Sequence, residues 1–107
     1  MLVGDSTMLG MAYGGNDARS IVAASYSLTY DAASCRRVLA PSCRGHGVIP
    51  LSVVPTMQQY AGRLGSVVVV MAGYDDIDIS AGVDAVLAEA ARQGVQRVLW
   101  LDYPTSV

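Results

Sequence analysis

The stretch SVVVVMAG, residues 66–73, decides the fold class of this 107-residue chain. Its apolar residues follow one another without a break over positions 67–72, and the β-branched valines favour an extended backbone. A continuous run of this kind is typical of a strand buried on both faces, as in a parallel sheet covered by helices. The run is far shorter than the roughly 20 residues of a membrane-spanning helix, so we expect no membrane span.

Further strand-like runs alternate with helix-like segments along the rest of the chain. The other strand-like runs are 2–3 (LV), 26–32 (YSLTYDA) and 96–103 (QRVLWLDY). Helical patterns follow Ser6, lie within 53–64 and cover 80–92. With right-handed crossovers, this order predicts an α/β fold: a doubly wound, mostly parallel sheet with flanking helices in a flavodoxin-like, three-layer arrangement.

The helix at 80–92 has the clearest pattern, because its apolar residues recur three and four positions apart. Ser80 is expected to cap its N-terminus, and Gly94 stands where a left-handed residue ends a helix. The helix within 53–64 tolerates Pro55 in its first turn. The residues expected on the buried faces are Val83, Val86, Leu87, Ala90 and Ala91 in the first helix and Met57, Tyr60, Ala61 and Leu64 in the second.

Composition limits the chain to one compact domain over residues 1–107, since 52% of the residues are hydrophobic and only 15% are charged. The net charge of -2 lacks the basic excess that nucleic-acid binding requires. No signal peptide pattern occurs at the start.

Cys35 and Cys43 can form a disulfide in an exported protein or remain two buried thiols in a cytosolic one. The polar residues around them favour the bridge, and with it a secreted protein, over a metal site.

Polar residues follow all four strand-like runs at the ends where ligands bind in parallel α/β sheets. Ser6 follows the first run, at a turn from strand to helix. A serine there can act as a helix cap, contact a phosphate or serve as a nucleophile whose oxyanion is held by backbone N–H groups. The four polar sets, expected along one edge of the sheet, are 4–6, 31–36, 73–76 and 102–104.

Three blocks of the sequence together resemble the SGNH (GDSL-type) hydrolases: LVGDST at 2–7, YDAASCRR at 30–37 and VVVVMAGYDD at 67–76. The resemblance extends over essentially the whole chain and implies that Ser6 is the nucleophile of an ester or acyl hydrolase. The family's second oxyanion donor is a glycine N–H after the second strand, where this chain has Cys35 beside Arg36. Gly45 and Gly47 are alternatives for that donor. The loop with Gly73 and Asp75 would complete the anion pocket.

Two departures from the family pattern weaken the resemblance. Asp75 replaces an asparagine that donates to the oxyanion, and a carboxylate can help there only if it is protonated. Asp76 is expected to have a structural role, and the carboxylates of DDIDI (75–79) fit a solvated turn better than a cation site. The family's Asp-x-x-His block does not occur, and the only histidine, His46, lies in a glycine-rich loop. We therefore expect a truncated chain, the front part of a hydrolase domain, in which Ser6 is poorly activated and activity is weak or absent.

The leading interpretation is a serine ester or acyl hydrolase acting on a small acyl ester, either a lipid or an acylated carbohydrate, with no cofactor and no metal. The alternative is a non-catalytic module of the same fold that binds acyl groups or carbohydrates, which Asp75 and the missing base favour. A receiver-like domain that holds magnesium is disfavoured, because Asp5 is the only acidic residue after the first strand and the chain has no lysine.

Overall fold

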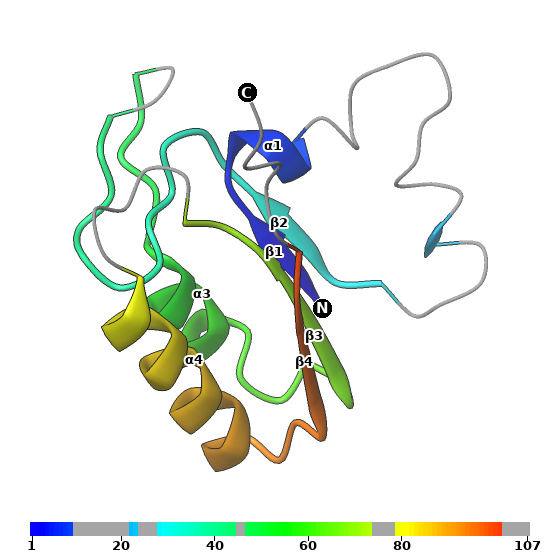
Figure 1. Ribbon diagram of the computed structural model, residues 1–107. Coiled ribbons are helices and arrows are strands. Elements are labelled where there is room, and N and C mark those ends of the chain that lie inside the picture. Colours follow the sequence, from blue (N-terminus) through cyan, green and yellow to red (C-terminus); the bar gives the residue numbers. More distant parts are fainter. Residues whose placement is uncertain (10–21, 24–27, 45–46, 74–78, 102–107) are drawn as a thin grey trace.

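The computed structural model describes residues 1–9, 22–23, 28–44, 47–73 and 79–101 of the chain. The four described strands form one sheet in the order β2-β1-β3-β4, and all of them are parallel (Figure 1). The described elements are β1 (Leu2–Gly4), α1 (Ser6–Leu9), β2 (Tyr30–Ala32), α3 (Val53–Gln59), β3 (Val67–Met71), α4 (Ser80–Arg92) and β4 (Arg97–Trp100). The predicted α/β class with a parallel sheet is confirmed.

The strands are shorter than the sequence runs that predicted them. The second strand occupies only Tyr30–Ala32 of the predicted 26–32, and the fourth only Arg97–Trp100 of the predicted 96–103. Residues 24–27 and 102–107 lie outside the described part of the chain. None of the described helices is long and apolar enough to cross a bilayer.

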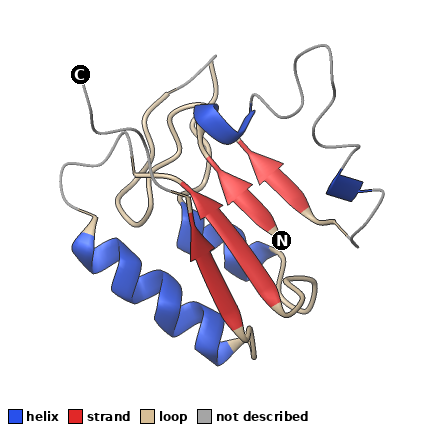
Figure 2. Cartoon of the chain, turned by 45° about the vertical axis from the view of Figure 1, so that its right-hand side comes forward, coloured by secondary structure: helices blue, strands red, loops and turns tan. Residues whose placement is uncertain are grey.

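The core lies between the sheet and helices α3 and α4, which pack together on one face (Figure 2). Val3 is in register with Asp31 on one side and with Val70 on the other, so these three side chains share that face. Val3 and Val70 are fully buried. The other buried core residues are Met1, Val38, Val53, Met57, Leu64, Val68, Ala72, Val86 and Ala90.

The opposite face of the sheet is more open, and here the expectation of burial on both faces is wrong for the described residues. Burial alternates along β3, where Val68 and Val70 are buried while Val67 and Val69 are only half-buried. Leu99 of β4 is 52% exposed. The reason is that α3 and α4 both cover the Val68 and Val70 face, so fewer described groups pack on the other.

Helix α4 has the predicted bounds, and Gly94 has the predicted left-handed backbone with φ +78°. Two other expectations are wrong. Ile79 occupies the N-cap position without a side-chain cap, and Ser80 is the first helical residue. The buried face comprises Gly82, Val86, Glu89 and Ala90, whereas Leu87 and Ala91 are exposed.

Gly82 explains the orientation of α4. A Cβ at this position would lie 2.5 Å from Cγ1 of Val38, so the close approach of helix and loop requires glycine. Glu89 is buried because three side chains satisfy its carboxylate: Gln58 donates at 3.1 Å, Gln93 at 2.7 Å, and Arg92 forms an ion pair with it. Helix α3 lies within 53–64 as predicted, but it ends at Gln59, so Tyr60, Ala61 and Leu64 are not part of its face, and Ala61 is exposed.

Candidate active site

Strands β2, β1 and β3 end together, so the segments that follow them leave from one edge of the sheet. Gly4 is in register with Ala32 and with Met71. Backbone hydrogen bonds continue past the strands: the Asp5 N–H donates to the Met71 carbonyl at 2.9 Å, and the Ala33 N–H donates to the Gly4 carbonyl at 3.1 Å. Strand β2 lies on one side of β1, and the chain then crosses β1 to form β3 on its other side. This reversal, between β1 and β3, is where parallel α/β sheets bind ligands.

The turn that carries Ser6 is fixed by close packing. A Cβ on Gly4 would lie 2.6 Å from the Met8 Cβ and 2.7 Å from the Met71 carbonyl oxygen, so only glycine fits there. Met8 is buried beneath the turn, and its carbonyl accepts a hydrogen bond from the Tyr30 hydroxyl at 2.8 Å. Ser6 itself is the first residue of α1 and is exposed. The turn therefore presents Ser6 to solvent from a rigid base.

Cys35 has a backbone conformation that side chains rarely adopt. Its φ is +66°, and no other described non-glycine residue has a positive φ. This left-handed region costs a residue with a Cβ about 1–2 kcal/mol. Cys35 forms the predicted disulfide with Cys43, with the two Cα atoms 5.4 Å apart. None of the described acceptors takes a hydrogen bond from the Cys35 N–H.

Arg36 joins the ends of β1 and β2 from inside the protein. Its side chain is 4% exposed and forms an ion pair with Asp31 at 2.9 Å. Its Nη1 donates to the Asp31 carbonyl at 2.9 Å and to the Gly4 carbonyl at 3.4 Å, and its Nε donates to the Leu51 carbonyl at 2.8 Å. The backbone N–H of Arg36 donates to the Ala33 carbonyl at 3.4 Å. These contacts make Arg36 a clamp between the segments that carry Ser6 and Cys35.

Asp31 and Tyr60 extend this clamp. Asp31 was expected in the polar set 31–36 and Tyr60 on a helix face, but neither was expected to have a role in the site. The Tyr60 hydroxyl donates to Oδ2 of Asp31 at 2.9 Å. This hydrogen bond, together with burial and the negative charge of Asp31, raises the pKa of Tyr60. The Arg63 guanidinium stacks over the Tyr60 ring at 4.8 Å. A carboxylate placed five residues before an arginine, in the block YDAASCRR, was the available signal.

Gly73 follows β3 at the same edge, with φ +125°. A Cβ there would lie 3.3 Å from the Ile79 side chain, so both backbone conformation and space favour glycine. Asp75, Asp76, Gly45 and His46 lie outside the described residues. Within the part of the chain that is described, no three metal-binding side chains gather. The structure thus assembles Ser6, Cys35, Arg36 and Gly73 at one edge, with Arg36 turned to protein oxygens.

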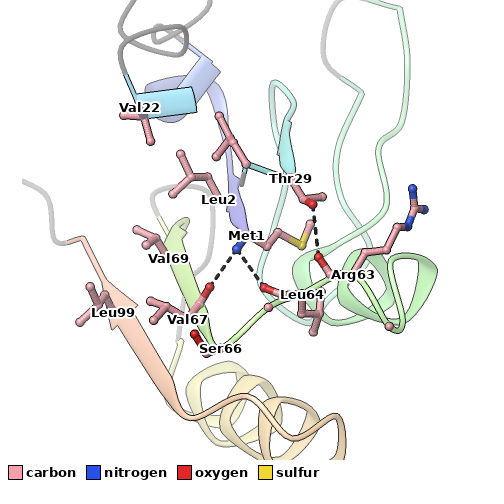
Figure 3. A pocket seen from close by; sticks show the side chains of 13 residues that line it. Met1, Leu2, Val22, Thr29, Arg63, Leu64, Ser66, Val67, Val69 and Leu99 are labelled. Atoms are coloured by element: carbon pink, nitrogen blue, oxygen red, sulfur yellow. Dashed lines mark hydrogen bonds between the residues drawn. The ribbon is translucent and has the colours of Figure 1, made fainter. Parts of the chain in front are cut away.

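A hollow of about 950 Å³ lies beside Met1, Ser66 and Val67, at the amino ends of β1 and β3 (Figure 3). Ser6 follows the other end of β1. The amino group of Met1 sits in the wall of the hollow and donates to the carbonyls of Leu64 at 3.0 Å and Val67 at 2.8 Å, and burial lowers its pKa. Thr29 closes one side through a hydrogen bond to the Arg63 carbonyl at 3.2 Å. Because the hollow is at the amino ends of β1 and β3, we do not include it in the candidate active site.

Comparison with protein-family models, with curated proteins and with solved structures finds no match to this chain. A functional conclusion therefore depends on the sequence motifs and on the geometry of this edge.

Proposed function

We propose that the chain is a serine ester or acyl hydrolase of the SGNH type, with Ser6 as the nucleophile. The Ser6 Oγ attacks the carbonyl carbon of an acyl ester, the bond to the alcohol breaks, and water then releases the acid and restores the serine. The backbone N–H groups of Ser6 and Cys35 would hold the oxyanion, with Gly73 beside them. The Asp-x-x-His block that supplies the family's base does not occur in the 107 residues, so no residue here is assigned that role.

The observation that carries this proposal is the left-handed backbone of Cys35. The resemblance places a glycine at this position, and glycine is the residue that adopts such a backbone without strain. Cys35 has a φ of +66°, a backbone that glycine adopts readily, so its N–H can serve as a glycine N–H would although the side chain differs. Strained residues of this kind cluster at functional sites.

The test is hydrolysis of p-nitrophenyl acyl esters by the whole chain. Turnover should be weak, because the family's base does not occur in the 107 residues. Ser6→Ala should abolish it, while Ser66→Ala, a change of the exposed serine directly before β3, should leave it unchanged. Equal turnover by the wild type and Ser6→Ala would refute the nucleophile assignment. Several chain lengths of the ester should be used, because the acyl group is not defined by the described residues.

The second candidate function is a non-catalytic module that binds acyl groups or carbohydrates at the same edge of the sheet. Asp75, where the family has a donor asparagine, favours it, since a carboxylate opposes the negative charge of the intermediate. Losing one oxyanion donor costs about 2.7–4 kcal/mol in catalysis. Calorimetric binding of a non-hydrolysable acyl ether without turnover of the matching ester would support this module.

Two further features belong to the same proposal. Strand order β2-β1-β3-β4 fits a doubly wound, three-layer sheet of the flavodoxin-like kind. The chain adds β2 on one side of β1 and then adds β3 and β4 on the other side. The Cys35–Cys43 disulfide is compatible with a secreted protein, since disulfides persist in oxidising compartments. Protein exported by its host and recovered with the bridge intact would support that location.

A further inference from the structure

The loop between β2 and α3 exposes four large aliphatic side chains, which we call the aliphatic loop surface. They are Leu39 (45% exposed), Val48 (63%), Ile49 (57%) and Leu51 (49%). The other exposed large hydrophobic residues of the described chain, Leu87, Leu99 and Leu101, lie on different elements. Such a cluster on a protein surface marks an interaction site more often than scattered single residues do.

A disulfide and two hydrogen bonds hold the two limbs of this loop, which lie on either side of Val48 and Ile49. The disulfide joins Cys43 to Cys35, and the Arg37 N–H donates to the Ser42 hydroxyl at 3.1 Å. The Ser52 hydroxyl donates to the Leu39 carbonyl at 3.3 Å. Figure 1 shows the two limbs rising side by side beyond the body of the protein, and in Figure 2 they lie on the side toward which the strands point.

Charge along the chain is unevenly distributed, and this loop lies in the basic part. Residues 32–74 contain four arginines and no aspartate or glutamate, whereas the rest of the chain contains three arginines and all nine acidic residues. Arg44 is exposed on the loop and donates to the Gly47 carbonyl at 3.1 Å. The aliphatic side chains are therefore accompanied by positive charge in a chain that is acidic as a whole.

We propose that the aliphatic loop surface docks onto an anionic lipid bilayer. Val48 and Ile49 enter the boundary between headgroups and acyl chains, and the Arg44 guanidinium lies at the level of the lipid phosphates. A projecting loop with aliphatic side chains and no carboxylate matches an anionic bilayer, whose acyl-chain region is apolar and whose headgroups are negatively charged. Docking does not require Ser6 to be a nucleophile, but it would bring the carboxyl edge of the sheet close to the membrane.

Co-sedimentation of the whole chain with vesicles tests this directly. Binding to vesicles of phosphatidylcholine with about 30% phosphatidylglycerol should exceed binding to pure phosphatidylcholine and should weaken as salt rises. Val48→Asp with Ile49→Asp should weaken binding at least about tenfold. Arg44→Ala should weaken it about fivefold, the equivalent of about 1 kcal/mol for one basic residue. Leu87→Asp, at an equally exposed leucine of α4, is the control and should bind as the wild type does.

Three results would overturn the proposal. These are absence of binding to the anionic vesicles at low salt, equal binding to both vesicle types, or a loss with Leu87→Asp as large as that with the loop variant. Sedimentation of a dimer that the loop variant dissociates, without vesicle binding, would assign the surface to a second copy of the chain instead. Because vesicle binding needs no turnover, its failure is separate from failure of the proposed hydrolase activity.

Discussion

Replacing the disulfide in two ways tests whether Cys35 has a left-handed backbone. The pair Cys35→Ala with Cys43→Ser removes the bridge and leaves a Cβ at φ +66°, while Cys35→Gly with Cys43→Ser removes both the bridge and the Cβ. With a sequence separation of 8, the chain-entropy model assigns the bridge about 2.5 kcal/mol. The Ala pair should therefore lose about 2.5 kcal/mol of unfolding free energy. The Gly pair should lose about 1 kcal/mol less, because glycine accepts this backbone without strain.

Urea unfolding followed by circular dichroism measures both differences, and the slopes should agree among the variants so that the free energies can be compared. Wild-type protein with and without a thiol reductant provides the matched control for losing the bridge alone. A Gly pair that is no more stable than the Ala pair would refute the left-handed assignment. It would also remove the main support for Cys35 as an oxyanion donor.

Three further predictions concern the turn, the clamp and the helix pair. Gly4→Ala should destabilise the fold by about 1–3 kcal/mol, since its Cβ would meet the Met71 carbonyl at 2.7 Å; thermal unfolding unchanged from wild type would contradict this packing. Arg36→Met should destabilise by about 3–5 kcal/mol, because it leaves Asp31 without its buried partner, and adding Asp31→Asn should recover part of that loss in urea unfolding; no recovery would argue against the clamp. The ion pair with Arg92 lowers the pKa of Glu89 to about 2 from 4.5, so its stabilisation is complete above about pH 4.5 and is lost as pH falls towards 2. Because Arg92 is 62% exposed, the effect is weakened by solvent: the free energy of unfolding of the wild type should exceed that of Glu89→Gln at neutral pH, and this difference should close on acidification. A difference independent of pH would contradict this.

The sheet could be predicted from the sequence because its strands are short apolar runs separated by helix-length segments, and chain order together with handedness leaves few arrangements. The run at 67–72 identified β3 and the parallel sheet correctly. Burial of both faces could not be predicted from that run, because the valines on the open face are as apolar as those in the core. Which face a helix covers depends on the tertiary contacts of α3 and α4.

For the candidate site, only its location at the carboxyl edge of the sheet could be predicted. Ser6, Cys35 and Gly73 follow three strands that end in register, so position along the chain was sufficient to place them at one edge of the sheet. The orientation of Arg36 could not be predicted, since an arginine beside a loop serves a ligand or a carbonyl equally well by sequence. Burial of Glu89 was missed for a related reason: its partners Gln58 and Gln93 come from two different segments.

The nucleophile assignment is tested most directly by treating the whole chain with a fluorophosphonate and locating the adduct by peptide mass spectrometry. The hydrolase proposal predicts one phosphonyl group, on Ser6, with no adduct in Ser6→Ala and an unchanged yield in Ser66→Ala. Label on another serine, or equal label in the wild type and in Ser6→Ala, would contradict it.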